Sequence, residues 1–257
     1  MAGEGRGVGP GAGRIALTLA DDRIARFSRQ LLLPGFGEAA QERLAAARVR
    51  AVGAGGAVSA ALAYLVQAGV GRLWIDDAEP VAPADATGWI YGQADVGTPR
   101  VDAARDALRA LSRFCDVEAY PAGGVPTATL VAAPSLAQAL HAAEAARRAG
   151  VPHVVLEPDA DGGAIVTVPP GAPCYACARS TTGAGRPPLP GAAALAALAA
   201  SELVHLVATP DAVPGRRVDL VRGVATVRPT SRLAGCACGA APGAQSPATG
   251  PASGSAN

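Results

Sequence analysis

The sequence predicts one α/β domain with a mainly parallel sheet, and three observations support this. Short apolar segments alternate with longer alanine-rich segments through residues 1–157, which is the order of strands and helices in a parallel sheet. One apolar segment, ending at Val52, leads into a glycine turn and then a helical segment. Half of the 257 residues are hydrophobic, which is enough for a sizeable core.

Glycine and proline set the element boundaries. Gly69 and Gly150 end helices, Pro99 suits the first turn of another, and Gly223 lies at the turn of a hairpin over 216–229. We expect strands at 48–52, 72–76, 116–120, 129–133, 153–157 and 163–168, and helices at 22–33, 38–47, 56–68, 99–112, 135–149 and 191–207. Segment 78–98, rich in Pro, Gly and Ala, is expected to be a loop.

Composition bounds the domain and its surroundings. Residues 1–20 and 239–257 are predicted to be largely disordered, which leaves 21–238 as the domain. The net charge of +1 argues against a nucleic-acid partner. No apolar run of about 18 residues and no signal peptide is evident, so we expect a cytoplasmic protein without a membrane partner. All 22 basic residues are arginine, which excludes a P-loop lysine.

The glycine turn in "RVRAVGAGGAVSAAL" departs from the G-x-G-x-x-G pattern at one position. Gly53, Gly55 and Gly56 are present, but Val58 stands where the last glycine is expected. The first glycines allow the bend and the approach of phosphates, whereas the last one serves helix–strand packing. Asp77 lies 22 residues after Gly55, where an acid holds ribose hydroxyls. The turn therefore predicts a nucleotide site, with a compact unliganded turn as the alternative.

The cysteines suggest a metal centre. Cys174 and Cys177 form one close pair, Cys236 and Cys238 another, and Cys115 stands apart. Two close pairs brought together by a fold supply the four thiolates that structural Zn²⁺ prefers. We predict a structural zinc site, with reduced unligated thiols as the alternative. Cys115 is expected to be a small buried residue.

Several pieces of the sequence together carry a resemblance to one known protein family. The longest is "RFSRQLLLPGFGEAAQERLAAARVRAVGAGGAVSAALAYLVQAGVGRLWIDDAEPV". The others are "ADVGTPRVDAARDAL", "AGVPHV", "PCYAC" and "GCACG", in the order of the family. These pieces resemble the ThiF/MoeB/HesA family of E1-like, ubiquitin-activating-type adenylyltransferases, and the similarity spans about residues 22–239. The resemblance implies a Rossmann-like sheet with an E1-like C-terminal extension that carries the zinc knuckle.

The resemblance also implies a reaction and its residues. Family members use ATP·Mg²⁺ to adenylate the C-terminal Gly-Gly carboxylate of a ubiquitin-like protein or peptide. They are homodimers in which an arginine, here Arg29, reaches the active site of the partner. Asp77 corresponds to the acid that binds the ribose and Glu79 to a second acid. Arg100 stands where the family has a phosphate-binding lysine, and it keeps that charge with a different geometry.

Three family features are missing. The phosphate-binding arginine has no counterpart in segment 83–91, and the magnesium-binding aspartate falls at Pro134 or Ser135. Residues 178–201 contain no cysteine for a thioester. Neither Pro nor Ser replaces a carboxylate as a ligand of a hard cation. Two hypotheses follow: an E1-like adenylyltransferase, or a dimeric pseudoenzyme that binds a nucleotide or peptide without adenylation. A third, an NAD-type dehydrogenase, leaves the cysteine pairs without a role.

Overall fold

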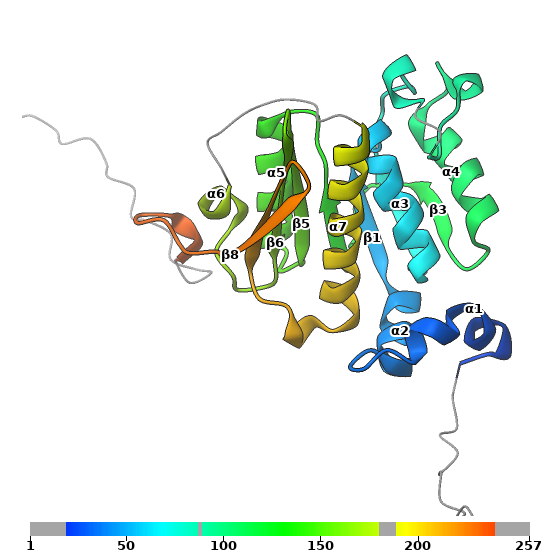
Figure 1. Ribbon diagram of the computed structural model, residues 1–257, viewed down its shortest axis with the longest axis horizontal. Helices are drawn as coiled ribbons and strands as arrows, with labels where there is room; N and C mark the ends of the chain where they lie inside the picture. Colours follow the sequence, from blue (N-terminus) through cyan, green and yellow to red (C-terminus); the bar gives the residue numbers. More distant parts are fainter. Residues whose placement is uncertain (1–18, 87–88, 180–188, 240–257) are drawn as a thin grey trace, which may run out of the picture.

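The protein is built around one sheet, which confirms the predicted α/β class (Figure 1). The computed structural model describes residues 19–86, 89–179 and 189–239. The predicted disordered segments, 1–20 and 239–257, therefore lie almost wholly outside the described residues. Within the described part, eight strands form the sheet in the order β3-β2-β1-β4-β5-β6-β7-β8.

The sheet has a parallel half and an antiparallel half. Strands β1 to β5 pair in parallel, as the alternation predicts, and β5 to β8 pair in antiparallel fashion. The strands are β1 (Arg48–Val52), β2 (Arg72–Asp76), β3 (Asp116–Ala119), β4 (Ala128–Val131), β5 (His153–Asp159), β6 (Gly162–Val168), β7 (Arg216–Val221) and β8 (Val224–Pro229). The predicted hairpin is β7–β8, and its turn residues Arg222 and Gly223 both have positive φ, as a two-residue I′ turn requires.

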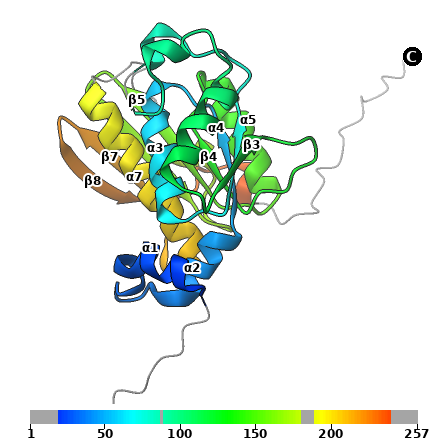
Figure 2. The ribbon, with the colours of Figure 1, turned by 90° about the vertical axis from the view of Figure 1, so that its right-hand side faces the viewer.

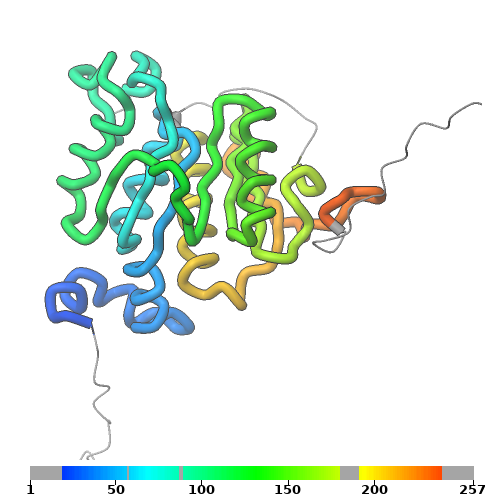
Figure 3. Tube along the Cα trace, turned by 180° about the vertical axis from the view of Figure 1, so that it is seen from behind, coloured from blue at the N-terminus to red at the C-terminus, as the bar shows by residue number. Residues whose placement is uncertain are grey.

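Helices cover both faces of the sheet. The α-helices are α1 (Asp21–Leu31), α2 (Gly37–Ala46), α3 (Gly56–Ala68), α4 (Arg100–Leu111), α5 (Leu136–Arg148), α6 (Tyr175–Ala178) and α7 (Leu189–Ala208). Short 3-10 helices are η1 (Pro83–Asp85), η2 (Gln93–Asp95), η3 (Pro210–Ala212) and η4 (Ala237–Gly239). Helices α3 and α7 lie on one face, and α5 lies on the opposite face, as seen from behind in Figure 3.

Side chains alternate between the two faces along the central strands. Leu130 and Val154 are paired across β4 and β5 and belong to the core under α3 and α7. Val131 and Val155, the next pair, belong to the second core under α5. This period of two is what a sheet buried on both faces requires.

Helix α7 corrects one expectation from the sequence. Its segment Gly191–Ala208 is long and apolar enough to cross a membrane, although no such run was expected. Half of that segment is buried inside the protein, and α7 packs against α3 and the central strands. The hydrophobicity of α7 is therefore that of a core helix.

The carboxyl ends and the amino ends of the parallel strands lie at opposite ends of the molecule. The carboxyl end of β1 runs into the glycine turn and α3, whereas its amino end follows α2. Figure 2 shows α1 and α2 together below the sheet, away from the glycine turn. Ligands of open parallel sheets bind outside the carboxyl ends of the strands, so the first candidate site lies at that edge.

Candidate functional site

The glycine turn is a tightly packed bend. Gly53 has a φ of +89°, and a Cβ atom there would lie 2.4 Å from the carbonyl oxygen of Ala132. At Gly56, a Cβ atom would lie 2.8 Å from the Cα atom of Asp85. Gly55 is the extended residue before α3. Val58, in place of the last glycine, is buried in the core. The glycines thus serve the close approach of β4 and η1 to the turn.

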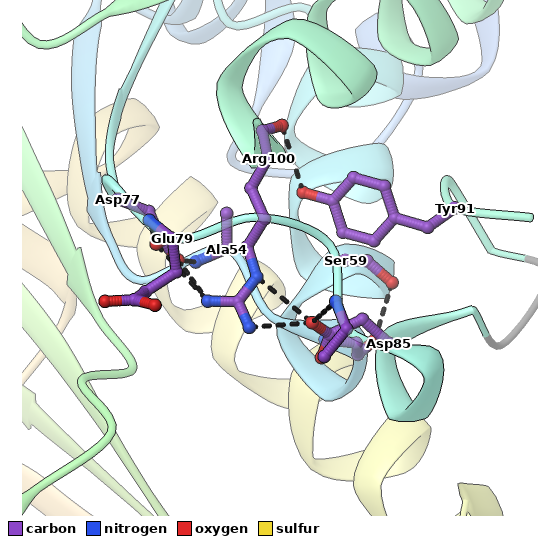
Figure 4. Close-up of polar contacts among 9 residues, drawn as sticks. Ala54, Ser59, Asp77, Glu79, Asp85, Tyr91 and Arg100 are labelled. Carbon is purple, nitrogen blue, oxygen red and sulfur yellow. Dashed lines mark hydrogen bonds and ion pairs between the residues drawn. The ribbon is translucent and has the colours of Figure 1, made fainter. Parts of the chain in front are cut away.

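Asp77 lies beside this turn, where the sequence places the ribose acid. Its Oδ2 accepts a hydrogen bond from the backbone N–H of Ala54 at 2.8 Å, and its Oδ1 accepts one from Glu79 at 2.9 Å. The side chain of Asp77 is only 6% exposed. Glu79 is exposed, and its carboxylate points away from the cluster in Figure 4.

Arg100 joins the turn to two carboxylates (Figure 4). Its Nη1 lies 3.0 Å from Asp77 Oδ2, and its Nη2 lies 2.7 Å from Asp85 Oδ2. A third contact runs from Nε to Asp85 Oδ2 at 3.1 Å. Burial opposes the charge of Arg100, but the hydrogen bonds and charges of Asp85 and Asp77 outweigh it and raise its pKa. We call Asp77, Asp85 and Arg100 the ion triad.

Asp85 occupies the start of helix α3. Its Oδ1 accepts the Gly56 N–H at 2.8 Å, and its Oδ2 accepts the Ala82 N–H at 3.0 Å in addition to Arg100. The side chain is 1% exposed. A helix N-terminus that follows a glycine turn is where the phosphates of a nucleotide bind. In this chain a carboxylate of its own lies there.

Sequence reasoning did not assign Asp85 to this place. Asp85 lies 29 positions after Gly56, with which it forms a hydrogen bond, and it belongs to an irregular loop. The loop contains η1 and η2 and carries no periodic pattern. The only local signal is the Pro83–Asp85 turn itself, in which Asp85 accepts from the Ala82 N–H.

The pH dependence of stability tests this placement of Asp85. Burial raises the pKa of Asp85. The N–H groups of Gly56 and Ala82 and the guanidinium of Arg100 lower it by more, so the net shift is downward. Stabilisation by Asp85 is therefore complete above the unfolded pKa of about 3.9 and is lost as the pH falls through the lower folded pKa. As the pH is lowered between those two values, the unfolding free energy of the wild type should decrease more steeply than that of Asp85→Asn. The difference in slope should reach up to about 1.4 kcal/mol per pH unit.

Urea unfolding at a series of pH values measures this slope. Asp106→Asn, which alters an exposed residue of α4, is the matched control and should keep the acid limb of the wild type. Equal slopes for the wild type and Asp85→Asn below about pH 4 would contradict the assigned contacts.

The end of β4 is where the family resemblance implies a magnesium-binding aspartate. The chain continues from β4 through Pro134 to Ser135, which caps α5. The Ser135 hydroxyl accepts the Gln138 N–H at 3.3 Å and donates to Gln138 Oε1 at 2.7 Å. Among the described residues 131–138 no carboxylate is present. Both oxygens of Asp85 are already engaged by donors, so these two places do not fit a magnesium site.

Arg29 does not join the site within one chain. It lies exposed in the last turn of α1, at the end of the molecule opposite the glycine turn (Figure 1). The three histidines are packing or surface residues. His153 is buried, whereas His141 and His205 are exposed. Cys115 is buried, as predicted, and burial raises its pKa to about 12.

The four paired cysteines form a second site. Cys174 is the N-cap of the short helix α6 and Cys177 lies within it, and the fold brings Cys236 and Cys238 beside them. All four Sγ atoms lie within 4.8 Å of one another, and three of the distances are 3.7 Å. A tetrahedron with Zn–S bonds of about 2.3 Å has edges of about 3.8 Å. The cluster therefore fits a closed, structural zinc site despite its short C-x-C pair.

Comparison with known proteins places these sites in a family context. The sequence profile of the ThiF family matches residues 27–227. The mouse "Adenylyltransferase and sulfurtransferase MOCS3" is 43% identical over 104 residues, which cover 40% of this chain and 23% of that protein. The "Sulfur carrier protein adenylyltransferase" of Thermus thermophilus is 41% identical over 101 residues, covering 39% of this chain and 37% of that one. The chain thus spans well under half the length of these curated relatives.

Solved structures agree on the fold. The structure of MccB from E. coli with ATP superimposes with a TM-score of 0.72 at 18% identity, and the match covers 86% of this chain and 75% of that one. At this identity the likeness concerns the fold alone. The family profile covers most of the domain, including the glycine turn, the ion triad and the first cysteine pair. The chain belongs to the ThiF family.

Proposed function

We propose that this protein binds ATP at the glycine turn and adenylates the C-terminal carboxylate of a small ubiquitin-like protein or a peptide. The observation that carries the proposal is the meeting of Asp77 and Arg100 at the carboxyl ends of β1 and β2. These residues match two that the family resemblance assigns to ATP. Both curated relatives described above are named as adenylyltransferases, one of them for a sulfur carrier protein.

Three parts of the chain would take part in the adenylation reaction. A carboxylate oxygen of the tail attacks the α-phosphorus of ATP. The bond from the α-phosphorus to the oxygen that bridges it to the β-phosphate breaks, and pyrophosphate departs. In this proposal Asp77 accepts hydrogen bonds from the ribose hydroxyls, and the Gly55–Gly56 backbone faces the phosphates. Arg100 neutralises the charge that develops on them. For this, Arg100 has to exchange its contact with Asp85 for one with phosphate.

Further parts of the proposal concern assembly. The four-cysteine cluster would hold structural zinc, which supplies no open position for substrate. Arg29 would act in a homodimer, because only a second chain can bring it to the glycine turn. The reaction would take place in the cytoplasm.

A second candidate function is favoured by Asp85. Its carboxylate already accepts hydrogen bonds from the first N–H of α3 and from the Arg100 guanidinium, which a bound phosphate would use. In addition, the end of β4 lacks the magnesium acid. Both observations support a non-catalytic E1-like scaffold that binds a nucleotide or the C-terminal tail of a peptide. On this alternative the ion triad persists when the partner binds.

ATP–pyrophosphate exchange separates the two candidates. The full chain is incubated with MgATP, labelled pyrophosphate and ubiquitin-like carriers that end in Gly-Gly. We expect exchange that depends on the carrier, because the acyl-adenylate forms reversibly. A carrier without its last glycine is the matched control and should support none.

The outcome without exchange is also informative. A rise in melting temperature with ATP or the carrier, but no exchange, would reject adenylation and support the scaffold. Neither exchange nor a thermal shift with either ligand would overturn both candidates.

A further inference from the structure

A pocket lies at the amino ends of β1, β2 and β3, at the edge of the sheet opposite the glycine turn. Its volume is about 510 Å³, within the range of small-molecule sites. Strands β1 and β2 each begin with an arginine, Arg48 and Arg72. A Cβ atom at Gly71 would lie 1.8 Å from the Ala45 carbonyl oxygen, so this glycine lets the end of α2 close one wall.

The wall of the pocket is strongly basic. The charged and aromatic residues that line it are Arg23, Arg48, Arg72, Arg113, Phe114 and Asp116. Four guanidinium groups thus face one carboxylate, a formal excess of three positive charges. In a chain whose net charge is +1, this concentration is local and does not follow from overall composition.

Nearby acids only partly neutralise these arginines. Arg113 pairs with Asp22 at 2.6 Å, but both side chains are largely exposed. Arg72 reaches Asp116 at 3.4 Å and Glu118 at 4.0 Å. Exposed pairs of this kind are weak, so an anion in the pocket competes with them at little cost.

Two arginines of the pocket have no acid partner in the described part of the chain. Arg23 and Arg48 form no ion pair there. Nη1 of Arg23 and Nε of Arg72 are buried and lack a hydrogen-bond acceptor. Buried donors without an acceptor are costly, and a turn of either side chain toward an oxygen-rich ligand in the pocket would supply the acceptor.

Phe114 arranges two of the guanidiniums. Those of Arg23 and Arg113 lie over its ring, 5.0 and 4.9 Å from the centroid. This stacking fixes their planes and leaves the ring less available to stack on a ligand base. Recognition in the pocket is therefore of an anion rather than of an aromatic group.

We propose that this pocket binds the phosphate groups of a small phosphorylated molecule, at a site separate from the glycine turn. The planar fork of each guanidinium matches two phosphate oxygens. The excess of positive charge suits an anion with more than one negative charge. The site does not depend on the proposed adenylation, because it shares no residue with the ion triad or with the cysteine cluster.

Calorimetric titration with pyrophosphate at low ionic strength tests the proposal. Arg23→Ala/Arg48→Ala removes the two arginines without acid partners and leaves the glycine turn intact. The affinity for pyrophosphate should fall at least tenfold for each arginine, the effect of losing a charge-assisted hydrogen bond. Arg26→Ala/Arg109→Ala removes the same charge from exposed positions outside the pocket and should leave the affinity within about threefold.

Three results would overturn the proposal. They are no binding by the wild type, unchanged affinity in the pocket variant, and an equal loss in both double variants. The single variant Arg48→Glu alters one exposed side chain and provides a second reading if the double variant is poorly folded. Because both pocket variants keep Gly53 to Gly56, ATP–pyrophosphate exchange in them should be that of the wild type, which keeps this test distinct from that of the proposed function.

Discussion

Arg100→Met should lower the free energy of unfolding by about 3–5 kcal/mol, a large share of the total for a domain of this size. The methionine keeps much of the side-chain volume but removes the shared cation of Asp77 and Asp85. These carboxylates are only 6% and 1% exposed. Without Arg100 they remain buried beside each other, unneutralised, which is the costly outcome of breaking a buried ion pair.

Chemical denaturation of the wild type and variant measures this loss. Arg148→Met is the matched control, because Arg148 pairs with Glu144 on α5 but is 76% exposed. Its effect should be about 0.5 kcal/mol. In a double-mutant cycle, Arg100→Met with Asp85→Asn should be less destabilised than the sum of the single variants, by about 0.5–3 kcal/mol. A loss in Arg100→Met no greater than in the control would show that the triad is not a buried unit.

Cys174→Ser should abolish zinc binding and release the end of the chain. We expect near-stoichiometric zinc in the wild type and less than about a tenth of that in the variant, because three thiolates and a hydroxyl are a much weaker donor set. Residues 231–236 are mostly exposed, so few packing contacts hold them. At zinc concentrations of about 1,000 times the Kd, losing the metal removes about 4 kcal/mol of stability.

Metal analysis and hydrogen exchange read out the two effects separately. Amides of segment 230–239 should lose protection in Cys174→Ser, whereas those of β1 and β4 in the central sheet should keep theirs. Cys115→Ser, which alters a thiol outside the cluster, should retain the zinc. Wild-type protein purified without zinc, or Cys174→Ser with its full zinc content, would contradict the proposed centre.

Local sequence signals were sufficient for most of the fold. Gly69 ends α3 with a φ of +101°, and Gly223 turns the β7–β8 hairpin, so in both places the residue type and the backbone conformation correspond. The spacing of Cys174 and Cys177 likewise predicted one half of the four-cysteine cluster. Its meeting with the second pair depends on the antiparallel strands β6 to β8, of which the sequence pattern indicated the β7–β8 hairpin.

The candidate site was less predictable because its decisive contacts are long-range. Asp77 and Arg100 were found through motif position, but Asp85 lies in a loop without periodicity, and only the folded chain brings it to Gly56. The arginine pocket was missed for a similar reason. Arg48 and Arg72 are adjacent only because β1 and β2 pair in register, and Arg23 and Phe114 come from outside the sheet.

The ion triad also sets how a nucleotide would approach. Asp77, Asp85 and Arg100 sum to one negative charge, and the start of α3 returns only about half a unit of positive charge. Basic clefts raise the association rates of anions by about 10–10³ through their long-range field. The triad gives the glycine-turn edge no such attraction, so its field would not speed the arrival of ATP there. The electrostatic attraction for polyanions lies at the other end of the sheet.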